Sequence, residues 1–137
     1  MKVNNLFRFA LLFIVLALVS LACGFNASTA NITNAHMSVD ESDSQSTSAY
    51  APDASSFYCY FDLNNAPDET VVKGVWTLVS AEGYDSNQEI DSAEITGGDN
   101  NYYFSLGGGT DPWPVGQYKV DLYLNDELVQ TVNFEVK

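Results

Sequence analysis

The stretch WPVGQYKVDLYLNDELVQTVNFEVK, residues 113–137, decides the fold, because apolar and polar residues alternate in it twice. In the first run the residues on one side are Tyr118, Val120, Leu122 and Leu124, and those on the other side are Lys119, Asp121 and Tyr123. In the second run the apolar side has Val132, Phe134 and Val136, and the polar side has Thr131, Asn133 and Glu135. A period of two predicts strands whose apolar side chains face a core. Asn125 and Asp126 between the runs predict a tight hairpin turn. A slip by one residue would bury the charged side chains, so the register is strongly specified.

Similar segments, rich in β-branched and aromatic residues and separated by turn-forming residues, occur along the rest of the chain. The strong ones are 56–63, 70–80, 101–106, 116–125 and 127–137, with a weaker one at 88–95 and a first edge strand expected at 32–39. After residue 23 no segment has a helical period with caps. Short strands with regular turns are typical of a two-layer all-β domain. The sequence predicts an antiparallel β-sandwich of about seven strands.

Trp76 in the second strong segment and the pattern Gly116-x-Tyr118-x-Val120 resemble an immunoglobulin-like domain. In that fold a core tryptophan lies on strand C, and a tyrosine corner opens strand F two residues before a disulfide cysteine. Here Cys59, expected on strand B, would face Val120, so the resemblance implies the sandwich without its inter-sheet disulfide.

The N-terminus has a basic start, Lys2 and Arg8, followed by an apolar run that is too short to span a membrane and so predicts an export signal. Ser20-Leu21-Ala22-Cys23 resembles the looser form of the bacterial lipobox, which implies a diacylglyceryl group on Cys23. We therefore expect a signal peptide at 1–22 and a tether at 23–30. The alternative is ordinary cleavage within NASTANIT, residues 26–33, which would leave a secreted domain.

The remaining range, 31–137, is expected to form one domain, with a mobile acidic, serine-rich loop at about 40–55. NITNAHM, FYCYFDLNNAPDETVVKGVW and the C-terminal stretch resemble bacterial envelope lipoproteins with a single immunoglobulin-like domain of unassigned role. This resemblance implies a location at the cell envelope, outside the cytoplasmic membrane, with the lipid as the membrane contact. It supplies no active-site residues.

Charge excludes one class of partner. Removal of residues 1–22 leaves three lysines against all eighteen acidic residues, and therefore a net charge of −15. Such a surface repels phosphate backbones. We expect no nucleic-acid partner.

The residue types also argue against catalysis and cofactors. His36 is the one histidine, so a zinc site or a histidine-activated Cys59 has too few groups. Asp40, Glu41 and Asp43 are weak calcium candidates, and a solvated acidic loop is the alternative. Apart from the lipid on Cys23 we expect no cofactor.

Three tyrosines are the candidate binding face. If Phe57, Cys59 and Phe61 face the core, Tyr58 and Tyr60 face outward, and Tyr103 joins them from the neighbouring strand while Tyr102, Phe104 and Leu106 face inward. Tyrosine is favoured in recognition surfaces. The alternatives are cross-strand pairing, or cover by residues 40–55. The hypothesis is a non-catalytic, lipid-anchored module that binds a protein or a glycan; a purely structural envelope protein and a small glycan-acting enzyme are the alternatives.

Overall fold

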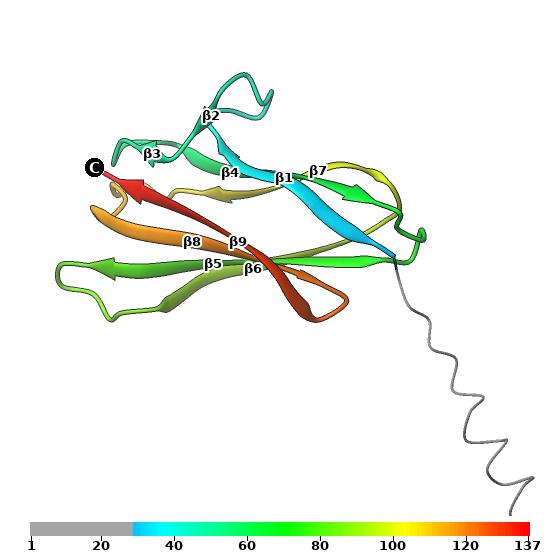
Figure 1. The fold of residues 1–137 in the computed structure, drawn as a ribbon. Helices are drawn as coiled ribbons and strands as arrows, with labels where there is room; N and C mark the ends of the chain where they lie inside the picture. The colour runs from blue at the N-terminus through cyan, green and yellow to red at the C-terminus, as the bar shows by residue number, and fades with distance from the viewer. Residues whose placement is uncertain (1–28) are drawn as a thin grey trace, which may run out of the picture.

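The computed structural model describes residues 29–137, which form a sandwich of two β-sheets (Figure 1). Residues 1–28, with the predicted signal peptide and Cys23, lie outside the described residues. The strands are β1 Asn31–Ser38, β2 Ser46–Thr47, β3 Ala49–Tyr50, β4 Ser56–Asn64, β5 Val71–Ala81, β6 Gln88–Thr96, β7 Asn100–Gly107, β8 Gly116–Leu124 and β9 Glu127–Val136. No helix long and apolar enough to cross a membrane occurs among residues 29–137.

One sheet has the order β2-β1-β4-β7 and the other has the order β3-β9-β8-β5-β6. The predicted all-β sandwich is confirmed, and each segment expected to be a strand forms one. The structure has nine strands rather than about seven, because the range predicted as a loop contributes two-residue strands β2 and β3. One pairing departs from the predicted antiparallel pattern, since β3 runs parallel to the C-terminal part of β9.

Inward-facing side chains of both sheets build the core, as the alternation predicts. The indole of Trp76 is 1% exposed and lies edge-on to Phe134, with ring centroids 6.1 Å apart. Every inward residue predicted for β8 is buried, and so are Phe57, Cys59 and Phe61 of β4. Val132 and Tyr102 are only partly buried, because they pack at the margin of the core.

Asp121 is buried, although it lies on the outward side of β8 as the alternation predicts. Its carboxylate is on the outer face of the five-stranded sheet, yet the residue is only 6% exposed. Lys119 Nζ lies 2.7 Å from Oδ2, and the Thr131 hydroxyl donates to Oδ1 at 2.6 Å. Because β8 is a central strand, side chains of the flanking strands cover the carboxylate, and these two partners satisfy it.

Two local features of the C-terminal hairpin match the sequence prediction. Asn125 and Asp126 both have positive φ, 48° and 70°, as a two-residue hairpin turn requires. The Tyr118 hydroxyl donates to the Pro114 carbonyl at 2.6 Å, which is the tyrosine corner that the resemblance implied. This hydrogen bond links the loop before β8 to the beginning of the strand.

Removal of the Tyr118 hydroxyl tests how much this hydrogen bond stabilises the fold. We expect Tyr118→Phe to lower the free energy of unfolding by about 1–2 kcal/mol, because the part-buried Pro114 carbonyl loses its donor. Urea unfolding followed by tryptophan fluorescence measures the change. Tyr123→Phe is the matched control, since this ring is on the opposite face of the same strand and is only half-buried. Equal stability of the two variants would contradict the prediction.

Candidate functional site

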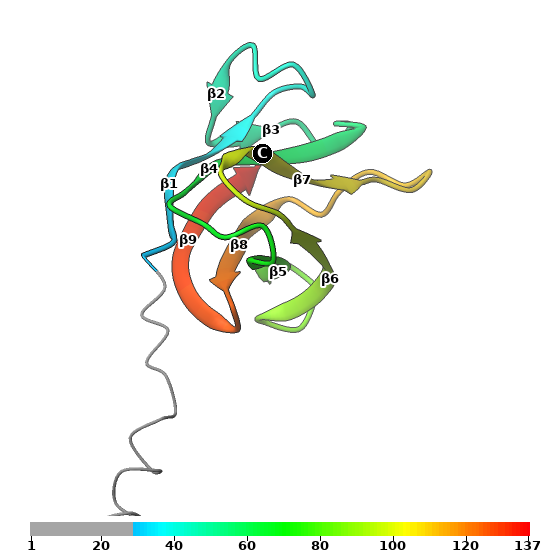
Figure 2. The ribbon, with the colours of Figure 1, turned by 90° about the vertical axis from the view of Figure 1, so that its right-hand side faces the viewer.

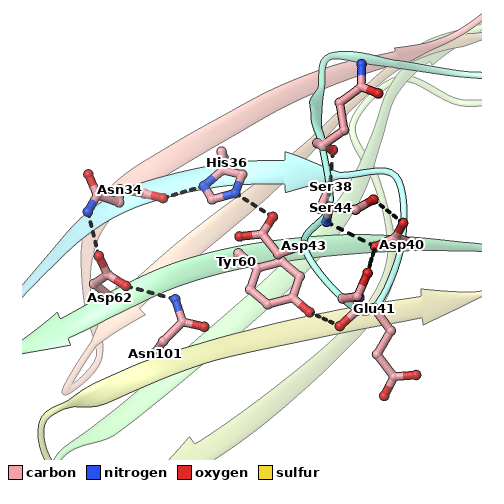
Figure 3. Close-up of polar contacts among 12 residues, drawn as sticks. Asn34, His36, Ser38, Asp40, Glu41, Asp43, Ser44, Tyr60, Asp62 and Asn101 are labelled. Carbon is pink, nitrogen blue, oxygen red and sulfur yellow. Dashed lines mark hydrogen bonds and ion pairs between the residues drawn. The ribbon is translucent and has the colours of Figure 1, made fainter.

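The polar–aromatic face is the outer surface of the four-stranded sheet. It comprises the outward side chains Asn34, His36, Tyr58, Tyr60, Asp62, Asn101 and Tyr103. Strand β4 supplies its central row, and β1 and β7 supply the flanking rows, since both strands pair with β4. Figure 3 shows five of these side chains, Asn34, His36, Tyr60, Asp62 and Asn101, next to the loop that follows β1.

A β-bulge in β1 places His36 on this face. Ile32 packs against the core and Met37 is 1% exposed, although their odd separation should put them on opposite sides of a regular strand. The register with β4 shifts by one residue between Thr33 and His36, which restores the parity. Asn34 absorbs the extra residue with φ 53°, a conformation that asparagine tolerates better than most residues.

His36 joins the bulge to the acidic segment. Its Nδ1 lies 2.6 Å from the Asn34 carbonyl oxygen, and its Nε2 lies 2.9 Å from Asp43 Oδ1. Partial burial lowers the pKa of His36, but the Asn34 carbonyl and the Asp43 carboxylate, with Asp62 nearby, raise it further, so the net direction is above 6.5. These contacts favour the imidazolium form, in which both ring nitrogens are donors, relative to an isolated histidine.

Residues 39–45, which we call the cap, form a compact turn above the face. The Val39 amide donates to the Gln45 carbonyl at 3.0 Å, which closes the turn. The Asp40 carboxylate accepts bonds from the hydroxyls and amides of Ser44 and Ser42, and these donors lower its pKa to about 2. The segment predicted to be a mobile loop thus has a specific hydrogen-bonded conformation; its mobility stays a prediction.

The three predicted tyrosines differ in how exposed they are, because the cap contacts them unequally. Tyr60 is 5% exposed, because its hydroxyl donates to the Glu41 carbonyl and the cap lies over its ring. The expectation that Tyr60 is an open contact residue is wrong, and the alternative of cover by residues 40–55 holds for it. Tyr58 is half-buried, whereas Tyr103 is 38% exposed and donates to Glu41 Oε1 at 2.6 Å.

The tyrosine rings also contact one another, so cross-strand pairing, the other alternative, is present as well. Tyr60 and Tyr103 stack at a centroid distance of 5.0 Å, and Tyr58 lies 6.1 Å from Tyr103. β4 and β7 are neighbours, as the sandwich prediction required. Tyr103 is the most exposed of the three tyrosines.

Next to Tyr103 is a polar ladder across three strands that sequence reasoning missed. Asn101 Nδ2 on β7 donates to Asp62 Oδ1 at 2.8 Å, and Asn34 Nδ2 on β1 donates to Asp62 Oδ2. These two amides, with the charge of His36, hold the pKa of Asp62 below its ordinary value. The alternation of β4 places Asp62 outward, but no signal in the sequence locates the bulge that brings Asn34 to it.

The ladder forms the floor of a shallow, open depression of about 490 Å³. Its lining residues are Asn34, Ala35, His36, Asp43, Ser46, Asp62 and Asn101. All of them except Ala35 carry a polar side chain, and several retain hydrogen-bonding capacity toward solvent. The depression therefore suits a ligand that offers many neutral polar groups.

Cys59 takes no part in this face, whereas the predicted calcium ligands Asp40, Glu41 and Asp43 belong to the cap beside it. Cys59 is a buried free thiol whose pKa is raised to about 12 by burial, so it stays protonated. Within residues 29–137 no three His, Cys, Asp or Glu side chains are arranged to hold a metal ion. The calcium assignment to Asp40, Glu41 and Asp43 stays a prediction.

No protein-family model and no curated protein matches the chain. An immunoglobulin-like protein from Pseudomonas aeruginosa superimposes with a TM-score of 0.54 and 17% identity, over 82% of this chain and 100% of that one. The chain has an immunoglobulin-like fold. The alkylpurine DNA glycosylase AlkC from Pseudomonas fluorescens, bound to DNA containing an abasic-site analogue, matches with a TM-score of 0.53 and 15% identity, over 88% of this chain. The chain spans only 33% of the length of the glycosylase, and both likenesses show the fold alone.

The contact between His36 and Asp43 predicts a pH dependence of the cap. The folded-state pKa of His36 is above its unfolded value of about 6.5, so the stabilisation is fully present below that pH and is lost as the pH rises through the folded pKa. The half-exposed pair contributes less than about 1 kcal/mol. Urea unfolding at about pH 5.5 and about pH 8 measures it, together with hydrogen exchange of the cap amides.

His36→Gln is the control for this measurement, because glutamine keeps a polar side chain but has no proton to lose in this range. The difference in unfolding free energy between the natural chain and this variant should shrink from the lower to the higher pH. A difference that grows with pH would contradict the sign of the pKa shift.

Proposed function

We propose that this chain is a non-catalytic binding module that holds a neutral glycan on its polar–aromatic face and is tethered to the cell envelope through lipid on Cys23. The observation that carries the proposal is the Asn34–Asp62–Asn101 ladder beside the exposed ring of Tyr103. Planar amide and carboxylate groups next to an aromatic ring match the alternating hydroxyl groups and apolar faces of a sugar.

The ladder retains the groups that such a ligand needs. Each asparagine amide has two N–H donors and one carbonyl oxygen, and the bond to Asp62 uses one donor of each. The remaining N–H and oxygen of both residues are available to vicinal hydroxyls. Because the bonds to Asp62 orient both amides before binding, little side-chain entropy is lost on association.

Electrostatics favours an uncharged ligand over an anionic one. Asp40, Glu41, Asp43 and Asp62 all lie on or beside the face, with His36 as the one cationic group among them. Phosphates, acidic sugars and nucleic acid would be repelled by these carboxylates and by the net charge of the mature chain. The DNA bound by the glycosylase therefore does not suggest a DNA ligand here.

The same groups argue against turnover of the glycan. Glycoside hydrolysis requires a carboxylic acid whose pKa is raised so that it can protonate the leaving oxygen. In the depression the amides of Asn101 and Asn34 lower the pKa of Asp62 instead. The depression is also open to solvent and does not enclose a substrate.

The tether rests on the sequence. A short apolar run ends in Ala22-Cys23, and the first strand begins at Asn31, so a lipid on Cys23 would hold the domain close to a membrane. Two acyl chains anchor a protein far more firmly than one. A small domain held at the membrane can bind a ligand on an open face such as this depression, because such a face does not require the volume of a deep pocket.

Binding of neutral oligosaccharides tests the function. Linear oligosaccharides of glucose, mannose and N-acetylglucosamine are titrated into the domain, and amide resonances and the heat of binding are followed. We expect at least one series to shift Asn34, His36 and Asn101, and Asn101→Ala and Tyr103→Ala to weaken it by at least about tenfold, which equals about 1.4 kcal/mol. Recovered saccharide should be intact.

Asn133→Ala is the matched control, because Asn133 is an exposed asparagine on β9 in the other sheet. It should bind as the natural chain does. Absence of any shift on the polar–aromatic face with all three series would refute the glycan assignment.

The tether is tested separately in a bacterial host. We expect the mature chain to begin at residue 23, to carry the mass of a diacylglyceryl group, and to partition into detergent. Cys23→Ser should abolish the lipid mass and leave the chain in the aqueous phase. A natural chain of unmodified mass that begins elsewhere would contradict the tether without affecting the glycan assignment.

A further inference from the structure

The four outermost strands of the two sheets differ in how they are protected against pairing with another chain. β2 and β3 have only two residues each. β6 has nine residues, but it carries three acidic side chains, Glu89, Asp91 and Glu94, and its pairing with β5 contains a register shift. Short length, charge and irregular register are the means by which edge strands avoid unwanted partners.

β7 has none of these protections. Its sequence, NNYYFSLG, contains no charged residue and no proline, and its pairing with β4 is unbroken from Leu63↔Asn100 to Ser56↔Gly107. Its other side has no neighbouring strand in the sheet. A regular, uncharged edge of eight residues exposes a row of backbone donors and acceptors that fits one more extended strand.

The space beside this edge lies over an uncovered part of the opposite sheet. The Phe104 ring of β7 packs directly on Gly74 of β5, where an added Cβ would lie 2.6 Å from the ring. β7 therefore covers β5, whereas β6 lies one strand further out, at the edge of its sheet (Figure 2). Eight of the nine residues of β6 are exposed. If the opposite sheet covered β6, the residues on its inner face would be buried.

The uncovered inner face of β6 has a mixed character. Asp91 and Ala93 lie opposite Trp76 and Gly74 in the register, so they face the same side as these core residues. Ile95, opposite Val72, packs partly against the core. An added strand would cover the two apolar residues and would meet the carboxylate of Asp91.

An apolar groove of about 240 Å³ lies where β6 begins and the loop before β8 passes. Its walls include Leu78, Tyr84, Ile90, Trp113, Pro114 and Tyr118, with Glu89 at its margin. Tyr84 is 55% exposed and Ile90 is 39% exposed. A side chain of an added strand could anchor in this groove.

We infer that the free edge of β7, beside the uncovered face of β6, is a strand-addition site for an extended, lysine- or arginine-containing segment of a partner protein. The site is independent of the glycan proposal, because it uses the backbone of β7 and the inner side of β6. Charge selects the partner: Asp91 faces the site, Glu89 lines the adjoining groove, and neither β6 nor β7 contains a basic residue. A second copy of this acidic chain is repelled for the same reason.

A synthetic peptide with blocked ends that alternates valine and lysine over ten residues is the probe. Hydrogen exchange of the β7 amides is measured by NMR with and without the peptide. We expect alternate β7 amides to exchange at least about tenfold more slowly when it is bound, because each forms a new hydrogen bond. A peptide of equal charge with proline at alternate positions should give no slowing, since it has too few backbone donors.

Two variants locate the binding. Ser105→Lys places a charge on the β7 edge and should abolish the slowing, whereas the control Asn133→Lys adds the same charge to β9 and should leave it unchanged. Asp91→Asn should weaken binding of the peptide, and Asp126→Asn, in the distant hairpin turn, should not. Thermal unfolding confirms that each variant is folded.

The inference is overturned if β7 amides exchange equally with and without the peptide, or if the proline peptide slows them as well. It is also overturned if sedimentation shows that the chain dimerises and Ser105→Lys abolishes the dimer, because the occupant is then a second copy. Loss of glycan binding in Asn101→Ala with retained peptide binding would separate this site from the polar–aromatic face.

Discussion

The structure depends on one constraint, which is that alternate residues of the long strands other than β6 must reach a single core between two sheets. The core contains the rings of Trp76, Phe57 and Phe134, which come from three strands in both sheets, with the Phe134 ring in contact with the other two. A strand shifted by one residue would turn its apolar side chains away from this core. Parity also determines what lies on the outside. In β1 the apolar residues Ile32 and Met37 have the wrong spacing, and the bulge at Asn34 corrects it. The placement of His36 and Asn34 is thus a consequence of core packing.

The cap follows from the same correction. Once His36 faces outward, its ring can reach Asp43, while the Tyr60 hydroxyl reaches Glu41 from the next strand. These contacts hold a turn that is already organised by Asp40 and its serine donors. The acidic segment therefore covers Tyr60 and leaves Tyr103, which it contacts through Glu41 Oε1, 38% exposed.

Much of the fold could be predicted from the sequence, since β8 and β9 alternate cleanly and the turn residues between them have one suitable geometry. The tyrosine corner was implied by the resemblance of Gly116-x-Tyr118-x-Val120 to an immunoglobulin-like domain. Asp121 could not be assigned, because its burial depends on Lys119 and on Thr131 of the neighbouring strand. The polar ladder was missed for a similar reason: it joins three strands far apart in the sequence, and one of its members reaches its position only through the bulge.

β7 takes part in both proposed binding surfaces, and the two do not conflict. Its outward side chains, Asn101 and Tyr103, belong to the polar–aromatic face, whereas its backbone edge points along the plane of the sheet. Side chains perpendicular to a sheet and backbone groups within its plane do not compete for space. Charge on this strand would have protected the edge, but it would also have placed an ion next to Tyr103. An uncharged β7 therefore leaves both proposed surfaces open.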